Sequence, residues 1–242
     1  MPDAILITIV IPVKNEQETL PGLAREIDAA FAAQAYPWEV LWVDDGSTDR
    51  TRALMEGLPA PHRWIGLDRN HGQSAAFMAG FRAARGTWIG TLDGDGQNDP
   101  ADLPRQLAHA LDKGVDMVNG IRAKRQDSWF RKVSSKIGNG IRNWMTGNTV
   151  QDVGCSTRVV RREAAIDLPF FHGMHRFLPT LVQMRGWTIA EIPVNHRQRA
   201  GGASKYGLWN RMPSAGRDLF GVRWLKSRNR NFKIAAQGGA AS

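Results

Sequence analysis

Short apolar runs alternate with amphipathic segments along the first half of the chain, and few folds accommodate such an alternation. The run at residues 5–13, ILITIVIPV, is rich in β-branched side chains, which is typical of a strand buried on both faces of a parallel sheet. From Leu20 onward the apolar residues recur at helical spacing, with Thr19 as the candidate N-cap and Pro21 in the first turn. The unit then repeats, which predicts a doubly wound, mostly parallel, Rossmann-like α/β sheet with right-handed crossovers.

The repeats predict further elements in order along the chain. Strands are expected at residues 38–46, 62–67, 87–93 and 115–120, and helices at residues 49–56, 73–84 and 99–112. The alternation then becomes less regular, and the patterns indicate a basic helix at 128–145, a strand at 154–162, a helix at 175–185 and a strand at 187–194. A chain of 242 residues that is 42% hydrophobic is long enough to bury a substantial core.

Polar clusters follow four of the predicted strands: KNE at residues 14–16, DDGS at 44–47, DGDGQ at 93–97 and NGIR at 119–122. Because open α/β sheets bind ligands at the C-terminal ends of their strands, we expect these clusters to line one crevice. The stretch TLDGDGQNDP (residues 91–100) gathers three aspartates, and a divalent cation would offset the repulsion among them. A solvated Asp/Gly turn and, for residues 44–49, a simple helix cap are the alternatives.

The charge and the cysteine count limit the classes of function. A net charge of +9 and a pI near 10.3 favour a phosphate-rich partner, which can be a nucleic acid, an anionic lipid surface or a nucleotide substrate. The single cysteine, Cys155, excludes an internal disulfide or a cysteine-based zinc cluster and favours a reducing compartment. The longest apolar run is about half of the ~20 residues that span a bilayer, so neither a membrane-spanning segment nor a secretory leader is expected.

The C-terminal part differs in composition from the rest of the chain. After Lys205 the only acidic residue is Asp218, while seven further cations are interleaved with tryptophan and phenylalanine. This pattern is typical of an amphipathic segment at an anionic membrane surface, although nucleic-acid binding and a basic helix packed on the domain use the same residue types. The last residues, 235–242, are expected to be disordered.

Four stretches carry a resemblance to a known family: IVIPVKNEQETL (9–20), WVDDGSTDRT (42–51), RNHGQSAAFMAGFRAARG (69–86) and TLDGDGQNDP (91–100). Together they resemble the inverting nucleotide-sugar transferases of glycosyltransferase family 2, which have the GT-A fold. The later stretches DVGCSTRVVRR (152–162), HRFLP (175–179) and PVNHRQRAGGASKYGLWNR (193–211) are similar to the branch of dolichyl-phosphate mannosyltransferase and the bacterial polyprenyl-phosphate glycosyltransferases. The resemblance covers residues 5–225.

The resemblance implies a metal-dependent hexosyltransferase that moves a sugar from a GDP- or UDP-linked donor to a polyprenyl phosphate of the dolichyl or undecaprenyl type. The product would be a lipid-linked sugar donor for cell-envelope glycan or lipid A modification. A family 2 enzyme that acts on a hydroxyl of a polysaccharide or soluble acceptor is the second hypothesis. A basic nucleic-acid-binding protein, in which the sheet is only a scaffold, is the third hypothesis. It is disfavoured because a water-insoluble prenyl acceptor accounts for membrane binding and gives no reason for binding nucleic acid.

The resemblance also assigns roles to individual residues. Nucleotide-sugar binding falls to Pro12, Val13, Asn15, Glu16, Asp44, Asp45, Gly46, Asn70, Gly72, Asp93, Gly94, Arg199 and Lys205. A Mg²⁺ or Mn²⁺ ion would be held by Asp93, Asp95 and Gln97, and the acceptor phosphate by Arg122, Arg131 and Ser135. The residues expected to be catalytic are Asp93, Asp95, Arg131 and Asp152, the last of which can equally serve to hold Arg131.

The chemistry of a phosphate acceptor agrees with the lack of a carboxylate base at the place where such a base would be sought. A hydroxyl acceptor needs a general base, whereas a phosphate monoester is already largely ionised at neutral pH. Where a carboxylate base would be sought, the chain has His175 and Arg176.

The sequence is divided into a GT-A domain at residues 1–206 and a basic aromatic segment at residues 207–242. Many relatives carry transmembrane helices after this point. Here we expect peripheral association with the inner face of the cytoplasmic membrane, either directly or through a partner protein. Nucleic acid is not expected as a partner, and the oligomeric state is left open.

Overall fold

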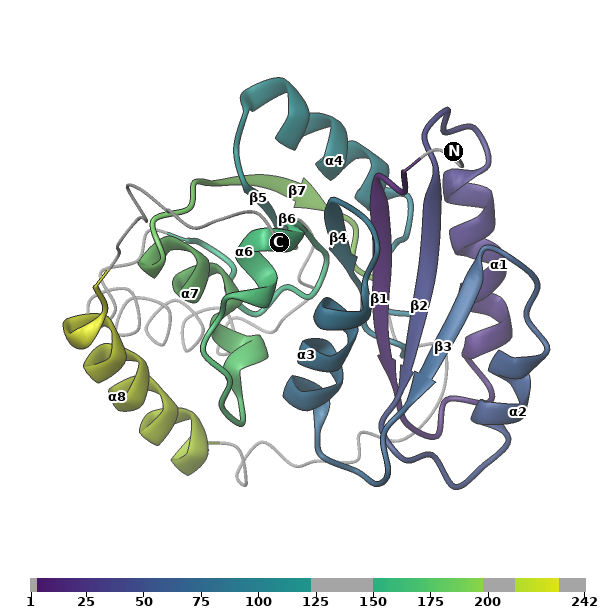
Figure 1. Cartoon of the computed structure of the whole chain (residues 1–242), viewed down its shortest axis with the longest axis horizontal. Helices are drawn as coiled ribbons and strands as arrows, with labels where there is room; N and C mark the ends of the chain where they lie inside the picture. Colours follow the sequence, from purple (N-terminus) through teal and green to yellow (C-terminus); the bar gives the residue numbers. More distant parts are fainter. Residues whose placement is uncertain (1–3, 123–149, 198–211, 231–242) are drawn as a thin grey trace, which may run out of the picture.

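A computed structural model describes residues 4–122, 150–197 and 212–230 of the chain (Figure 1). The strands are β1 (Ile7–Val13), β2 (Trp38–Asp44), β3 (His62–Gly66), β4 (Trp88–Thr91), β5 (Met117–Arg122), β6 (Arg158–Arg161) and β7 (Ile189–Val194). The helices are α1 (Leu20–Phe31), α2 (Thr51–Glu56), α3 (Gln73–Ala83), α4 (Asp102–Lys113), α6 (Arg162–Ile166), the 3₁₀ helix η1 (Met174–Phe177), α7 (Leu178–Met184) and α8 (Met212–Arg228).

The strands form one mixed sheet in the order β3-β2-β1-β4-β6-β5-β7. Every pairing is parallel except those of β6, which lies antiparallel between β4 and β5. The predicted mostly parallel α/β sheet is therefore confirmed. The reversed direction of β6 was not foreseen, because the apolar pattern of a strand carries no information on its direction.

The core lies on both faces of the sheet, and the side chains of β1 alternate between the two. Ile7, Ile9 and Ile11 pack with residues of α1 and α4, whereas Val10 packs with residues of α3, α6 and α7. All four side chains are fully buried, as expected for a central strand covered on both sides. Figure 1 shows α1 and α2 beyond the β2–β3 side of the sheet, and α8 at the opposite side of the molecule.

The structure corrects several predicted boundaries. The helix expected from residue 99 begins at Asp102, because Asp99 forms a turn in which its carbonyl accepts the Asp102 N–H and its carboxylate accepts the Ala101 N–H. Residues 119–122 do not follow β5 but belong to it, because β7 pairs with β5 as far as Arg122. The predicted helix at 175–185 is divided into η1 and α7. The predicted helix at 128–145 lies outside the described residues.

Thr19 occupies the N-cap position of α1, and Pro21 lies in the first turn, as predicted. The Thr19 hydroxyl does not cap the helix, however; it donates to the Gly94 carbonyl at 2.9 Å. The start of α1 is thereby tied to the loop that follows β4.

Helix α8 packs on the domain through one face. Val222 is 1% exposed within the same core cluster as α3, and Leu219 and Leu225 lie against that cluster. In the described part of the chain, no helix combines the length and the apolar character that crossing a membrane requires.

Candidate functional site

The carboxyl ends of β1, β2 and β4 meet at one place because glycines allow their loops to approach closely. A Cβ atom on Gly94 would lie 2.8 Å from Val13 Cγ1 and 3.0 Å from the Pro12 carbonyl oxygen. Gly46 has a φ of +71°, and a Cβ atom there would lie 2.7 Å from the Asn70 backbone nitrogen. Among the predicted nucleotide-sugar residues, Gly94 thus lies close to Pro12 and Val13, and Gly46 lies close to Asn70. Their role in donor binding remains a prediction.

Asp45 fixes the loop between β3 and α3. Its two carboxylate oxygens accept the backbone N–H groups of His71 at 2.7 Å and of Gly72 at 2.9 Å. The Asn70 amide oxygen accepts the same Gly72 N–H at 3.2 Å. Asp45 is 4% exposed, so its carboxylate stabilises the conformation of this loop as a buried hydrogen-bond acceptor.

Asp44 is fully buried at the end of β2. Its Oδ2 accepts two hydrogen bonds from Arg52, from Nε at 2.9 Å and from Nη2 at 2.7 Å, while its Oδ1 accepts the Ser47 N–H at 2.8 Å. The carboxylate therefore shapes the turn after β2. The alternative that Ser47 or Asp49 is the N-cap residue of the next helix is wrong, because Arg50 occupies that position. The Asp49 carboxylate nevertheless accepts the N–H of Thr51, the first residue of α2, at 2.9 Å.

Asn15 and Glu16 connect the loop after β1 to that same turn. Asn15 has a φ of 54°, and its amide oxygen accepts the Thr48 N–H at 2.8 Å. The Glu16 N–H donates to Thr51 Oγ1 at 2.9 Å. The two loops thus form one connected rim beside Gly94.

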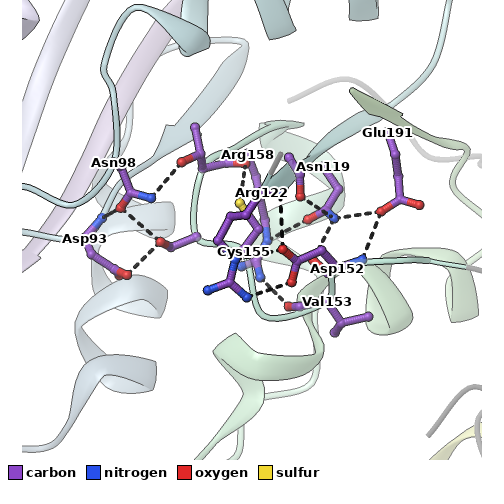
Figure 2. A network of polar contacts seen from close by, with 12 residues as sticks. Asp93, Asn98, Asn119, Arg122, Asp152, Val153, Cys155, Arg158 and Glu191 are labelled. Carbon is purple, nitrogen blue, oxygen red and sulfur yellow. Dashed lines mark hydrogen bonds and ion pairs between the residues drawn. The ribbon is translucent and has the colours of Figure 1, made fainter. Parts of the chain in front are cut away.

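Both carboxylate oxygens of Asp93 accept hydrogen bonds from side chains. Gln73, the first residue of α3, donates from Nε2 to Oδ1 at 2.7 Å, and Ser156 donates from Oγ to Oδ2 at 2.6 Å. The Asp93 backbone N–H is held by the Asn98 side chain at 3.1 Å (Figure 2). Burial raises the pKa of Asp93, and the neighbouring Asp95 raises it further, while the hydrogen bond from Ser156 opposes the shift.

Asp95 is much less constrained and suits a metal ion better. It is partly exposed, and its Oδ1 accepts the Gln97 N–H of its own loop at 3.2 Å. Carboxylate and amide oxygens are the donors that Mg²⁺ and Mn²⁺ prefer, with water and a phosphate completing the coordination. The donor set of Asp93, Asp95 and Gln97 fits such an ion. A group of three or more His, Cys, Asp or Glu side chains able to hold a metal does not occur in the described ranges, so a ligand would have to complete the site.

Asp99, the third aspartate of the stretch, has a different task. Its carboxylate pairs with Arg197 Nη2 at 3.0 Å and accepts from Asn195 Nδ2 at 3.3 Å. The buried Asp102 accepts the Asn195 N–H at 2.7 Å, and the Gln97 carbonyl accepts the Arg197 N–H at 2.9 Å. These bonds fasten the chain just before Arg199 and Lys205 to the aspartate loop; both of those residues lie outside the described residues.

Arg122 and Asp152 form a two-point ion pair on the other side of Asp93. Arg122 Nε lies 2.7 Å from Asp152 Oδ2, and Arg122 Nη2 lies 2.8 Å from Oδ1. Both side chains are largely buried, which strengthens a charge-assisted pair of this geometry. Asp152 thus holds Arg122. Arg131 and Ser135 lie outside the described residues, so a contact between Asp152 and Arg131 stays a prediction.

The pair His175 and Arg176 is engaged in internal contacts. His175 Nδ1 lies 2.7 Å from Oγ of the buried Ser74, and the Ser74 hydroxyl also accepts the Gly173 N–H at 2.9 Å. Arg176 lies 3.7 Å from Asp218 of α8. Cys155 is fully buried and burial raises the pKa of its thiol, which is consistent with a packing role.

Sequence reasoning missed four side chains that organise this site: Gln73, Ser156, Arg158 and Glu191. Glu191 of β7 accepts from Asn119 Nδ2 at 3.0 Å and from the Gln151 N–H at 2.9 Å. Arg158 is 3% exposed, and burial lowers its pKa. The sequence of this strand, RVVR, carries an arginine at each end and did not indicate which of the two is buried.

Comparison with known proteins places this arrangement in context. The model of the family described as "Glycosyl transferase family 2" matches residues 8–168. Glucosyl-3-phosphoglycerate synthase from Mycobacterium tuberculosis, in complex with Mn²⁺, uridine diphosphate and phosphoglyceric acid, superposes with a TM-score of 0.67 at 19% identity, covering 94% of this chain and 80% of that chain. S. aureus TarS 1-349 in complex with UDP superposes with a TM-score of 0.60 at 15% identity, covering 95% of this chain and 67% of that one. At these identities the solved structures establish the shared GT-A fold.

Proposed function

The chain belongs to glycosyl transferase family 2, and from that premise we propose that it transfers one sugar from a nucleotide-diphosphate sugar to a polyprenyl phosphate with inversion at the anomeric carbon. A phosphate oxygen of the acceptor forms the new bond to that carbon. The bond from the carbon to the donor diphosphate breaks, and the nucleoside diphosphate leaves with the electron pair. The observation that carries the proposal is that one short segment, residues 152–156, reaches both sides: Ser156 donates to Asp93 of the donor-side rim, and Asp152 binds Arg122.

The donor side is the rim formed by the ends of β1, β2 and β4. Asp95, with Asp93 and Gln97, would hold the divalent cation against the donor diphosphate. When bound, that ion would offset the charge that develops on the leaving group. The protein's own part is to hold Asp93 by two hydrogen bonds and to fasten the aspartate loop through Asp99 and Arg197. The solved structure with Mn²⁺ and uridine diphosphate on this fold supports a nucleotide donor and a divalent cation.

The acceptor side is Arg122, with Arg131 and Ser135 as further predicted ligands of the phosphate. Arg122 is oriented by Asp152, so its guanidinium is fixed before an acceptor arrives. A fixed planar cation suits a phosphate better than a flexible lysine does. At residues 175–176, where a carboxylate base would be sought, the chain has a histidine that contacts Ser74 and an arginine that faces Asp218. The lack of a carboxylate at these two positions supports an acceptor that needs no base.

The proposal includes peripheral association with the inner face of the cytoplasmic membrane. Phe220 and Trp224 of α8 are 67% and 62% exposed and lie four residues apart, so they share one face of the helix. Arg217, Arg223, Lys226 and Arg228 are also exposed, whereas Asp218 turns toward Gly173 and Arg176. An aromatic face surrounded by cations suits an anionic bilayer that carries a lipid-linked acceptor.

The decisive experiment is a panel of UDP- and GDP-sugars incubated with polyprenyl phosphate and Mg²⁺ or Mn²⁺, with mass spectrometry of the lipid extract. We expect one nucleotide sugar to give a polyprenyl-phosphate sugar. Absence of a glycosylated lipid for every donor, together with turnover of a donor in the presence of another acceptor, would refute the lipid acceptor.

A second candidate is transfer to a hydroxyl of a polysaccharide or soluble acceptor. The observation in its favour is that the solved structure with 94% coverage of this chain contains phosphoglyceric acid. In this case a carboxylate near the acceptor must take up the hydroxyl proton, and Asp152 is the described carboxylate beside Arg122. Radiolabelled sugar in a water-soluble product, and none in the organic extract, would identify this function.

A further inference from the structure

Arg158 occupies an unusual position for a charged residue. It lies on β6, between β4 and β5, in register with Thr91 on one side and Asn119 on the other. Its side chain points to the same face of the sheet as that of Val160, which packs in the core cluster of α3 and α7. The guanidinium is therefore held inside the protein.

The hydrogen bonds of Arg158 go to neutral oxygens. Its Nε donates to Asn119 Oδ1 at 3.1 Å, its Nη2 to the Val153 carbonyl at 2.8 Å and its Nη1 to the His175 carbonyl at 3.3 Å. Within the described ranges, the ion pairs do not include this arginine. A buried cation without a direct carboxylate partner is costly, so its retention calls for a physical reason.

The three accepting oxygens come from three different segments, and two of these segments lead to Asp93. The 151–156 turn, held in its middle at Val153, delivers the Ser156 hydroxyl to Asp93 Oδ2. The η1 segment, held at the His175 carbonyl, sets the His175 ring against Ser74, the residue that follows Gln73 in α3. Gln73 in turn donates to Asp93 Oδ1. Figure 2 shows Arg158 between Asp93 and Asn98 on one side and Asn119 and Asp152 on the other.

We propose that Arg158 is a positioning residue for sugar transfer: one buried guanidinium fixes both segments that grip the two oxygens of Asp93. It also fixes the turn that carries Asp152, and through that residue Arg122. Arg158 contacts neither the donor nor the acceptor. The inference rests on the transfer of sugar by this family and does not depend on the identity of the acceptor.

The geometry explains why an arginine is needed here. A planar guanidinium presents five N–H donors in a fixed fork, and three of its nitrogens are used in three directions. A lysine retains the charge but offers a single nitrogen on a flexible stem. Arg158→Lys therefore preserves the charge and removes the simultaneous grip on Val153 and His175.

The test compares Arg158→Lys with Arg161→Lys. Arg161 lies on the same strand but binds Asp116 and lies over Trp88, remote from the 151–156 turn, so it is the matched control. We expect R158K to lower kcat by about 10²-fold, the loss associated with a misplaced catalytic group, with KM for the nucleotide sugar changed by less than about threefold. R161K should keep kcat within about twofold.

Hydrogen–deuterium exchange gives a readout that needs neither metal nor substrate. Peptides that contain Cys155 and Gly173 should exchange about tenfold faster in R158K than in the natural protein, because their amide hydrogen bonds lie in the two segments held by Arg158. Peptides from β1 should be unchanged. Unchanged exchange in both segments would overturn the proposal, as would faster exchange throughout the molecule, which would indicate a general folding role.

A double-mutant cycle with Ser156→Ala separates positioning from independent effects. If both residues act through the placement of Asp93, the double variant R158K/S156A should lose little more kcat than the worse single variant. Fully additive losses would contradict the proposal. If the lipid acceptor itself were wrong, the exchange measurement would still give the predicted result, so the two failures can be told apart.

Discussion

At the scale of single residues, the three aspartates of the 91–100 stretch have three different surroundings. Asp93 accepts from Gln73 and Ser156, Asp99 pairs with Arg197, and Asp95 remains partly exposed at the tip of the loop. A carboxylate with both oxygens accepting short side-chain hydrogen bonds is less available to a cation than one that accepts only a longer backbone bond within its loop. Asp95 is therefore the residue at which removal of the negative charge should have the largest effect.

We expect Asp95→Asn to lower transfer by about 10³-fold, because the metal contributes several kcal/mol to stabilising the leaving group. The midpoint of thermal unfolding should be unchanged, since Asp95 makes no contact beyond its own loop among those described. Initial rates at saturating Mn²⁺ and a melting curve check both points. Asp112→Asn, at an exposed aspartate of α4, serves as the control and should keep full activity. Full activity of D95N would exclude the proposed metal site.

Arg122 offers a second test at this scale. Arg122→Lys keeps the charge and loses the two-point contact with Asp152, so we expect KM for polyprenyl phosphate to rise roughly tenfold, in line with the loss of one charge-assisted hydrogen bond. KM for the nucleotide sugar should be unchanged. Steady-state kinetics with each substrate varied in turn provide the measurement, and Arg105→Lys is a surface control. A rise confined to the donor KM would remove Arg122 from the acceptor site.

At the scale of elements, α8 has two dissimilar faces. Its inner face contributes Val222 to the core, and its outer face presents two aromatic rings among cations. Burial of the inner face fixes the direction of the outer one. The two aromatic rings are exposed to solvent, while Val222 holds the helix on the domain. Exposed apolar surface of this kind is common where a protein binds a partner.

We expect the double substitution Phe220→Ser, Trp224→Ser to reduce binding to vesicles that contain anionic lipid by at least about tenfold, because each ring contributes ~1.5–3 kcal/mol when it is buried in the interface. Binding should also weaken as salt rises. Leu111→Ser, at an exposed apolar residue on α4, is the control and should bind normally. Cosedimentation provides the measurement. Equal binding of the double variant and the natural protein would contradict membrane docking through α8, and tight binding to an oligonucleotide in its place would support a nucleic-acid partner.

At the scale of the whole molecule, a buried polar cluster joins the first three parallel strands away from the site. Glu39 of β2 accepts from Thr8 of β1 at 2.8 Å and from Arg63 of β3 at 2.8 Å, and its Oε1 also accepts the Arg85 N–H at 3.1 Å. Glu39 is 3% exposed, so water cannot replace it readily. This cluster supports the sheet, and it does not touch the candidate site.

Glu39→Ala should therefore lower the free energy of unfolding by about 3 kcal/mol, because it removes the buried carboxylate that accepts from Arg63 and from the Thr8 hydroxyl. The Arg85 N–H also loses this acceptor but keeps Thr8 Oγ1 as its second one. Activity per folded molecule should remain unchanged. Urea unfolding measures the stability, and the exposed Glu56→Ala is a neutral control. A loss of activity without a loss of stability would show that the cluster influences the site.

Much of the fold was predictable because its signals are local. The β-branched run of β1, the helical spacing after Leu20 and the polar residues at the ends of β1, β2 and β4 all appear where expected. The candidate aspartates also lie at a shared edge of the sheet, as the topology of parallel strands requires. The direction of β6 and the inclusion of residues 119–122 in β5 were missed, because both depend on which strand becomes the neighbour.

The sequence by itself determined the α/β architecture, the acidic strand ends and the family, because each depends on the order of residues within short stretches. Only the tertiary structure decided which partner each charge acquires: Asp99 with Arg197, Arg122 with Asp152, and Arg158 with the carbonyls of Val153 and His175. The physical reason is that a charged side chain must be paired or hydrogen-bonded when it is buried, but the partner can come from any segment that folding brings within about 3 Å.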